Sequence, residues 1–350
     1  GGMRAVTWTQ VAQYIILIVA YMIPVVWLSV IHTGSPVPQV AYGQTLQKVT
    51  QLEKELNNPA TVRGAAEASA RKAFADKAAA AEARLKALEA GGDKFLAEEK
   101  AKLADEKAKA AFPADAAAAK TAWTAEVTGA KAKTAPVKSH AEPFPGKDDA
   151  ARNTARLNFL ALVFCLMVGT ASLPHILMRY YTTPSVREAR ISVGWSLFFI
   201  FLLYFTAPAL AVLVKFEVYS NLVGSAFAQL PAWVSNWAAV DKTLMAIADI
   251  NKDGLVQLAE ITIGGDLVVL ATPEIAGLPY VISGLVAAGG LAAALSTADG
   301  LLLTIANALS HDVYYKMLDP NASTGRRITV AKSLLLVVAL LAAYVTSLKP

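Results

Sequence analysis

The sequence has little that would support a disulfide-bonded scaffold or a metalloenzyme. It contains a single cysteine, Cys165, which excludes an intrachain disulfide framework. Its four histidines are scattered, and no nucleophile lies beside a base or a cluster of transition-metal ligands, so an enzyme is not expected. The net charge of +5 is not concentrated on one basic face, and nucleic acid is therefore not an expected partner.

Charged residues are also scarce outside one region. Asp, Glu, Lys and Arg make up 17% of the chain and hydrophobic residues 55%, an apolar share above that of a typical soluble protein. Most of the charge lies in residues 44–156, which are rich in Ala, Lys and Glu. The first residues lack a signal peptide, and an apolar run ends just before the last residue, so we interpret the chain as an internal fragment of a longer protein.

Five apolar stretches are long enough to cross a bilayer, which requires about 20 mostly apolar residues. Buried helices of a large soluble protein are the alternative, but so many runs of this length are not expected in one such chain. We therefore predict an all-α membrane protein with five transmembrane helices in the plasma (inner) membrane, in contact with lipid. The stretches are Val11–Ile31, Phe159–Met178, Ile191–Phe216, a span within Gly277–Leu309, and Ile328–Leu348.

Lysine and arginine in the short loops predict the orientation of these helices. Cations gather after the second and fourth stretches, so both loops and the N-terminus are expected in the cytoplasm. Residues 35–157 and 217–275 are then outside. The cations are Arg179, Arg187 and Arg190 in the first loop, and Lys316, Arg326, Arg327 and Lys332 in the second.

Residues 35–157 are predicted to form an external helical insertion that ends in a linker over Pro136–Gly146. Three runs rich in Ala, Glu and Lys are strong helix formers, and Pro and Gly residues separate them. A helical hairpin is expected. It is either a solvated element or a docking surface for an unknown protein partner. The runs are TLQKVTQLEKEL (45–56), ARKAFADKAAAAEARLKALEA (70–90) and AEEKAKLADEKAKAA (97–111).

The second external segment, residues 217–275, contains the pattern D-x-N-x-D-G-x-x-x-x-x-E at 249–260, which is typical of an EF-hand calcium loop. Gly254 permits the sharp turn, and short helices are expected on both sides of the loop. The alternative is a loop that keeps this geometry without the metal. The candidate Ca²⁺ ligands are the side chains of Asp249, Asn251, Asp253 and Glu260, the carbonyl of Leu255, and Gln257 through a water.

Polar residues interrupt the fourth apolar stretch at Ser296, Thr297 and Asp299. A carboxylate at membrane depth costs several kcal/mol and by default indicates a functional site. The two hydroxyls could instead bond back to their own helix. Small residues such as Gly289 and Gly300 surround the trio, so a neighbouring helix can approach closely.

Three stretches resemble, in the same order, motifs of the sodium:solute symporter family, acetate-permease-like branch. They are GGMRAVTWTQ (1–10), GTASLPHILMRYYT (169–182) and ISGLVAAGGLAAALSTADGLLLTIANALSHDVYYK (282–316). The resemblance implies part of a leucine-transporter-like fold of two inverted repeats. Residues 1–34 would be the fifth core helix, residues 158–216 the sixth and seventh, and residues 276–350 the eighth and ninth. The helical insertion lies outside the resemblance.

The resemblance also implies site residues. Ser296, Thr297 and the carbonyl of Ala293 match a sodium site. A second cation site of some members uses an acid where this chain has Gln10, and Asp299 stands at one of that site's hydroxyl positions. We therefore hypothesise that Asp299 and Gln10 face each other across a cation or proton site. Pro174 breaks the sixth core helix, and with His175 it is a candidate for the substrate path or gate.

The sequence thus predicts a secondary symporter that couples Na⁺ to uptake of a small organic solute by alternating access, with a short monocarboxylate such as acetate as the expected solute. One alternative is a membrane solute sensor built on the same fold. Another is a calcium-binding docking protein with an inert membrane anchor, although an anchor would not need Ser296, Thr297 and Asp299.

Overall fold

The structure is a computed structural model that describes residues 3–103, 109, 112–180 and 182–348. It divides into two compact units, which we describe separately. The span unit comprises residues 1–40, 144–210 and 269–350, and the insertion unit comprises residues 41–143 and 211–268. The insertion unit therefore combines parts of both segments that the charge pattern places outside the membrane.

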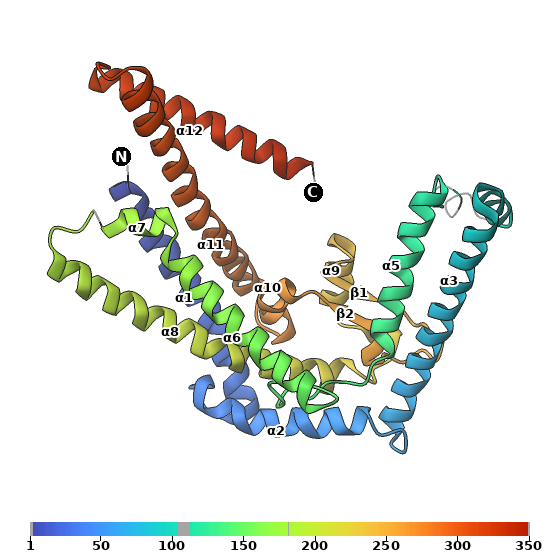
Figure 1. Ribbon diagram of the computed structural model, residues 1–350. Coiled ribbons are helices and arrows are strands. Elements are labelled where there is room, and N and C mark those ends of the chain that lie inside the picture. Colours follow the sequence, from blue (N-terminus) through green and yellow to red (C-terminus); the bar gives the residue numbers. More distant parts are fainter. Residues whose placement is uncertain (1–2, 104–108, 110–111, 181, 349–350) are drawn as a thin grey trace. The chain divides into compact units, whose positions relative to one another are not determined.

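Five described helices are long and apolar enough to cross a membrane, which confirms an all-α, multi-pass membrane protein (Figure 1). Two of them continue into π-helical turns, η1 (Val218–Leu222) after the third and η4 (Ala308–Leu318) after the fourth. The five helices are α1 (Met3–Thr33), α6 (Asp149–Ala171), α8 (Val186–Glu217), α11 (Tyr280–Asn307) and α12 (Thr324–Ser347).

The second apolar stretch is broken as the sequence predicts. Helix α6 ends at Ala171, and the short helix α7 (Pro174–Tyr180) begins at the proline. Proline lacks a backbone N–H and disfavours helical geometry at the residue before it, here Leu173. The side chain of Ser172 donates to the carbonyl of Gly169 at 3.0 Å and satisfies one group at the helix end.

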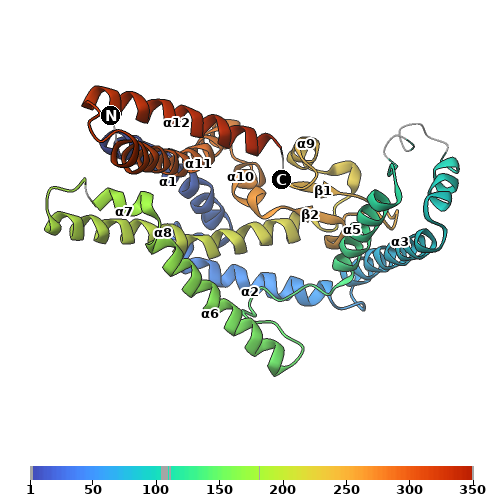
Figure 2. The same cartoon turned by 45° about the horizontal axis from the view of Figure 1, so that its top comes forward.

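The core of the span unit lies where α1 crosses α11, and Figures 1 and 2 show these helices side by side. Ala20, Val25 and Leu28 of α1 are buried. At Gly289 of α11 an added Cβ would lie 3.0 Å from the Cβ of Ala20, so a larger residue would require the neighbouring helix to give way by a few tenths of an ångström. The expectation that small residues bring helices together is confirmed at this position.

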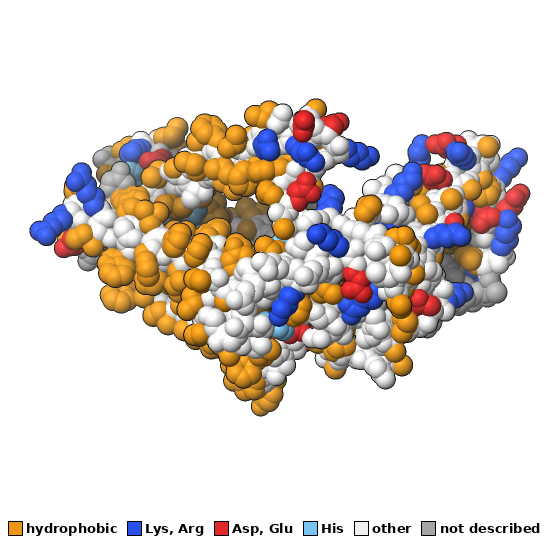
Figure 3. All heavy atoms as spheres, turned by 90° about the horizontal axis from the view of Figure 1, so that it is seen from below, with side chains coloured by type: hydrophobic (Ala, Val, Ile, Leu, Met, Phe, Trp, Pro, Cys, Tyr) orange, Lys and Arg blue, Asp and Glu red, His pale blue; other side chains and the backbone are white. Residues whose placement is uncertain are grey.

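The outer helices of the span unit expose their apolar side chains. Every described residue of α6 and α12 is at least partly exposed, including Phe164 and Leu340. On the face drawn in Figure 3, hydrophobic side chains cover much of the span unit, whereas charged side chains gather over the helical hairpin of the insertion unit. Lipid is the solvent that suits such helices.

The insertion unit contains the predicted hairpin, but its second arm differs from the prediction. The first arm is α3 (Val62–Ala101), bent at Gly92, and the second is α5 (Ala116–Thr134), which the sequence analysis did not single out. The predicted run 97–111 is helical to Ala101, and most of its remainder lies outside the described residues. Trp123 of α5 packs with Leu88 and Leu96 of α3. The preceding helix is α2 (Pro38–Leu56).

The rest of the insertion unit surrounds the EF-hand-like loop. Of the two stretches in which short helices were expected, the one after the loop begins with a 3-10 helix at Leu258–Glu260. The rest of the expectation is wrong, because strand β1 (Met245–Ile247) precedes the loop and strand β2 (Ile261–Ile263) follows it, antiparallel to β1. β-branched isoleucines favour this pairing over helix. The remaining elements are η2 (Phe227–Gln229), α9 (Ala232–Val240), η3 (Leu258–Glu260) and α10 (Gly265–Ile275), which continues into the span unit.

Candidate functional site

The polar positions of α1 and α11 meet at the helix crossing. The side-chain amide of Gln10 donates from Nε2 to the carbonyl oxygen of Ser296 at 2.6 Å. This contact joins the W-T-Q stretch of the first span to the S-T-A-D stretch of the fourth, 286 residues apart. Gln10 and Ser296 are both half-buried. The two motifs singled out in the sequence therefore lie together in the fold.

The predicted sodium ligands are brought together in part. The hydroxyl of Ser296 donates to the carbonyl of Ala293 at 2.8 Å, which is the bond back to the helix that the sequence analysis left open. The same geometry holds two oxygen atoms side by side, and oxygen is the donor that hard cations prefer. Thr297 is exposed on the surface of α11 and makes no hydrogen bond with another described residue through its side chain.

Asp299 lies in an open cleft of about 470 Å³ between α1, α11 and α12. Thr9 of α1 and Lys332 of α12 line the same cleft. Asp299 makes no ion pair with a cation among the described residues. Gln10 bonds to Ser296, about one helical turn before Asp299, and does not line this cleft. The sequence analysis assigned Lys332 to a loop, whereas in the structure it lies in α12. The packing of α12 brings it into the Asp299 cleft.

The residues of the predicted gate contact α11 directly. His175 of α7 is only 7% exposed, and its ring packs against Gly300, where an added Cβ would lie 3.4 Å from Cδ2. Its Nδ1 is buried and has no hydrogen-bond partner within the described ranges. Thr304, one turn further along α11, donates to the carbonyl of Gly300 and lies 3.5 Å from the sulfur of Met178. The break at Pro174 thus directs α7 onto the helix that carries Asp299.

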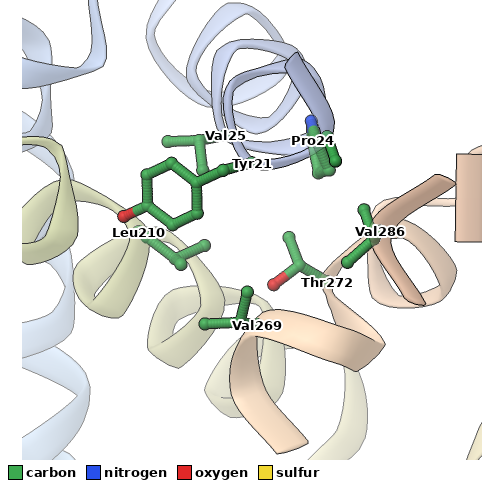
Figure 4. Close-up of a pocket in the computed structure, with 8 residues that line it drawn as sticks. Tyr21, Pro24, Val25, Leu210, Val269, Thr272 and Val286 are labelled. Carbon is green, nitrogen blue, oxygen red and sulfur yellow. The ribbon is translucent and has the colours of Figure 1, made fainter. Parts of the chain in front are cut away.

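A small cavity lies between α1, α8, α10 and α11 (Figure 4). Its lining residues are apolar apart from Tyr21 and Thr272. Pro24 of α1 is one of the apolar residues that line it. Its volume of about 10 Å³ is close to the minimum for one water molecule, so it does not accommodate an organic solute.

The EF-hand-like loop forms a tight turn held by its own side chains. Lys252 and Gly254 have positive φ values of 60° and 75°. Asp249 accepts from the backbone N–H of Gly254 at 3.0 Å, and Gln257 donates from Nε2 to Asp253 at 2.7 Å. Asn251 also donates to Asp253, at 2.9 Å. These hydrogen bonds hold the loop in a compact turn.

The last candidate ligand of the loop, Glu260, is buried beneath it. Its carboxylate accepts from the N–H groups of Ile250 at 2.7 Å and Gln257 at 3.1 Å. Burial, and to a smaller extent the charge of Asp249, raises the pKa of Glu260 above its ordinary value despite these bonds. Across the part of the chain that the structure describes, no three His, Cys, Asp or Glu side chains converge as a metal site would require.

Helix α3 of the hairpin holds the loop from the other side. Glu67 is 2% exposed, and its carboxylate accepts from the N–H groups of Leu258 at 2.8 Å and Ala259 at 3.1 Å. These donors open helix η3, whose first N–H groups have no partner within the helix. Lys133 of α5 donates to the carbonyl of Ile261. The role of Glu67 could not be predicted from the sequence, because no sequence pattern distinguishes its turn of α3 from the other turns of that helix.

Comparison with known proteins places these features in a family. The profile of the Sodium:solute symporter family matches residues 116–350, which include four of the five spans and both the Pro174 break and the S-T-A-D stretch. The chain belongs to the sodium:solute symporter family. Membership of this family agrees with the prediction that the chain is not an enzyme.

Two relatives extend this assignment. An uncharacterised symporter from Cupriavidus necator is 52% identical over 367 residues, which cover 100% of this chain and 53% of that protein. A monocarboxylic acid transporter from Corynebacterium glutamicum is 28% identical over 198 residues, or 56% of this chain and 29% of that protein. The chain thus spans about half or less of the relatives it matches. No solved structure matches it.

Proposed function

We propose that the full-length protein is a sodium-coupled symporter that takes up a short monocarboxylate such as acetate by alternating access. The hydrogen bond from Gln10 to Ser296 carries this proposal, because it joins the two helices at the polar positions where a coupling ion would bind. The donors we assign to Na⁺ are Ala293, Ser296 and Thr297. Binding sites at mid-membrane beside broken helices are typical of secondary transporters.

The solute is assigned from chemistry and from one relative. The Corynebacterium protein, 28% identical, is a monocarboxylic acid transporter. A carboxylate needs a compensating positive charge inside the membrane, and a co-transported cation supplies one. Asp299 is our candidate for a second cation or proton site, and Gln10, which bonds to Ser296 and does not line the Asp299 cleft, is its candidate partner on α1. Pro174 and His175 are our candidates for the gate, since His175 packs on the residue after Asp299.

Uptake of labelled acetate by the full-length protein in proteoliposomes tests the proposal. An inward Na⁺ gradient should drive uptake, and the double variant Ser296→Ala, Thr297→Ala should abolish it. Thr304→Ala is the matched control, because it removes a hydroxyl of the same helix that bonds to the carbonyl of Gly300. Uptake that ignores sodium and follows pH would overturn sodium coupling. It would assign the ion to Asp299, and Asp299→Asn should then abolish uptake.

A solute sensor is the competing function. It predicts acetate binding to the purified protein with no transport under any gradient. Binding without uptake in the same preparation would therefore replace the symporter proposal.

We also propose that the 249–260 loop binds Ca²⁺. The spacing of its oxygen-bearing residues supports this, as does the turn in which the side-chain oxygens of Asp249 and Asn251 both accept from the N–H of Asp253. Gln257 is 2% exposed, and its amide already reaches Asp253. Millimolar Ca²⁺, but not an equal concentration of Mg²⁺, should raise the melting temperature of the full-length protein. Equal melting with Ca²⁺ and with a chelator would exclude the site.

A further inference from the structure

A second cleft lies at the C-terminal end of α11, about two helical turns beyond Asp299. It has a volume of about 400 Å³ and is formed by the end of α11, the π-helix η4 and the first turns of α12. This volume is within the range of pockets that hold small ligands. The residues at its polar end are Asn307, Ser310, His311, Thr324 and Arg327.

Arg327 is the distinctive residue of this cleft. Its guanidinium stacks on the ring of Tyr315 at 3.7 Å, which fixes its plane. The neighbouring cations are each paired, Arg326 with Asp319 at 3.4 Å and Lys316 with Asp312 at 3.3 Å. Arg327 has no ion pair with any carboxylate in the described part of the chain. A half-buried, oriented guanidinium without an acidic partner is suited to bind an anion.

Another group at the polar end is a hydrogen-bond donor that suits a phosphate. Thr324 supplies a hydroxyl and lines the cleft with Arg327. His311 also lines the cleft, and its Nδ1 lies 3.0 Å from Oδ1 of Asp312. The first turn of α12 adds the positive end of a 24-residue helix. Phosphate accepts such bonds through several oxygens and pairs with arginine in a fork geometry.

Apolar side chains of α12 form part of the wall of the cleft. Ile328 lines it and is 51% exposed, and it begins the apolar part of α12. Val313, Met317 and Leu318 of η4 are exposed hydrophobic residues at the same helix end. A soluble anion would make no use of this wall, whereas a phospholipid would place its acyl chains along it. The lysines and arginines of this loop predict that it faces the cytoplasm, where anionic lipids attract basic residues.

We propose that this cleft binds the phosphate headgroup of an anionic phospholipid in the cytoplasmic leaflet, with Arg327 as its main ligand. The site is independent of the proposed ion site, since none of its residues belongs to the Gln10–Ser296 contact or to the Asp299 cleft. Bound lipid would join the end of α11 to the start of α12.

Native mass spectrometry of the full-length protein tests the proposal. The protein in neutral detergent is titrated with phosphatidylglycerol and with phosphatidylcholine, and the ratio of bound lipids is measured. Wild-type protein should prefer phosphatidylglycerol, and Arg327→Gln should reduce that preference about fivefold, the effect of roughly one basic residue at a membrane surface. Arg327→Lys should keep part of it, because it retains charge but loses the fork.

Arg326→Gln is the matched control, since Arg326 is adjacent in sequence but pairs with Asp319 and does not line the cleft. It should leave the preference unchanged. Equal preference in wild type and Arg327→Gln would overturn the proposal, as would an equal loss in Arg326→Gln and Arg327→Gln. If glycerol 1-phosphate or inorganic phosphate removes the bound phosphatidylglycerol at comparable concentration, the site takes soluble phosphate and the lipid assignment is wrong. If Arg327→Gln does not fold, Arg327→Lys and Thr324→Ala provide the same comparison.

Discussion

The amide of Gln10 donates to the backbone carbonyl of Ser296 at 2.6 Å and links the first span to the fourth. The carbonyl belongs to the residue whose hydroxyl bonds to Ala293, so one position of α11 is held from both sides. Any change in how α1 and α11 meet must break or lengthen this bond. It therefore connects helix packing to the geometry of the candidate ion site.

Gln10→Ala should weaken binding of the coupling ion. The change removes one hydrogen bond, which is worth about 1 kcal/mol or roughly a fivefold change in an equilibrium constant. The measurement is the sodium concentration that gives half-maximal uptake by the full-length protein. Thr329→Val is the control, because the hydroxyl of Thr329 donates within its own helix to Gly325 and Thr329 lines neither cleft. If Gln10→Ala leaves the sodium dependence of uptake unchanged, the hydrogen bond between Gln10 and Ser296 does not contribute to ion binding.

Gly289→Val should separate α1 from α11, because the added Cβ would lie 3.0 Å from the Cβ of Ala20. Overpacking of this kind costs about 1–3 kcal/mol. Gly284→Val is the matched control on the same helix, since an added Cβ there meets no atom within 4 Å. Melting temperature and uptake should both fall in the first variant only. Equal behaviour of the two variants would contradict the close approach.

Glu67→Gln should loosen the EF-hand-like loop, because the buried carboxylate caps η3 by accepting from two backbone N–H groups. Bonds to a charged group are worth about 1.5–3 kcal/mol and bonds to a neutral group about 1 kcal/mol. The amide oxygen of Gln can still accept, so the stability of the insertion unit should fall by about 1–2 kcal/mol. Glu82→Gln is the control, since Glu82 forms only an exposed ion pair with Lys131. Hydrogen exchange over residues 258–263 should speed up in the first variant, and unchanged exchange would contradict the capping role.

Lys215→Met should destabilise the insertion unit more than any surface change. Lys215 pairs with Glu53 at 2.6 Å, and the side chain of Glu53 is only 3% exposed. Removing one partner of a buried pair leaves an uncompensated charge and costs about 3–5 kcal/mol. Lys48→Met is the control, because it also removes a lysine charge, but Lys48 contacts the aromatic ring of Phe216 instead of a buried carboxylate. Adding Glu53→Gln to Lys215→Met should restore much of the lost melting temperature, and failure to do so would exclude the charge as the cause.

The stabilisation that Ca²⁺ provides should grow with pH. Burial raises the pKa of Glu260 above its ordinary value of 4.5. For a raised pKa, the contribution to stability is complete below the unfolded value and is lost as pH rises through the folded value. A bound Ca²⁺ would offset the stability that is lost when the Glu260 carboxylate ionises. At low pH, protons compete with Ca²⁺ for this carboxylate. Melting with and without Ca²⁺ should therefore differ more at pH 7 than at pH 4. A difference that is equal at both pH values would exclude Glu260 as a ligand.

The sequence by itself determined the elements that depend on local chemistry. Five spans follow from the length of the apolar runs, because backbone groups in lipid must be paired within a helix. The break before Pro174 follows from the missing N–H of proline. The pairing of Gln10 with the S-T-A-D stretch could be anticipated only through resemblance to a family, since nothing in the spacing of 286 residues predicts contact.

Only the tertiary structure decided what depends on distant partners. The flanks of the EF-hand-like loop are compatible with helices in isolation, but Met245–Ile247 and Ile261–Ile263 pair as strands because each offers the other its backbone groups. Glu67 became a helix cap because α3 packs against η3. Lys332 reached the Asp299 cleft because α12 packs beside α11. Each of these outcomes requires a neighbour from another part of the chain, and local propensity contains no information about that neighbour.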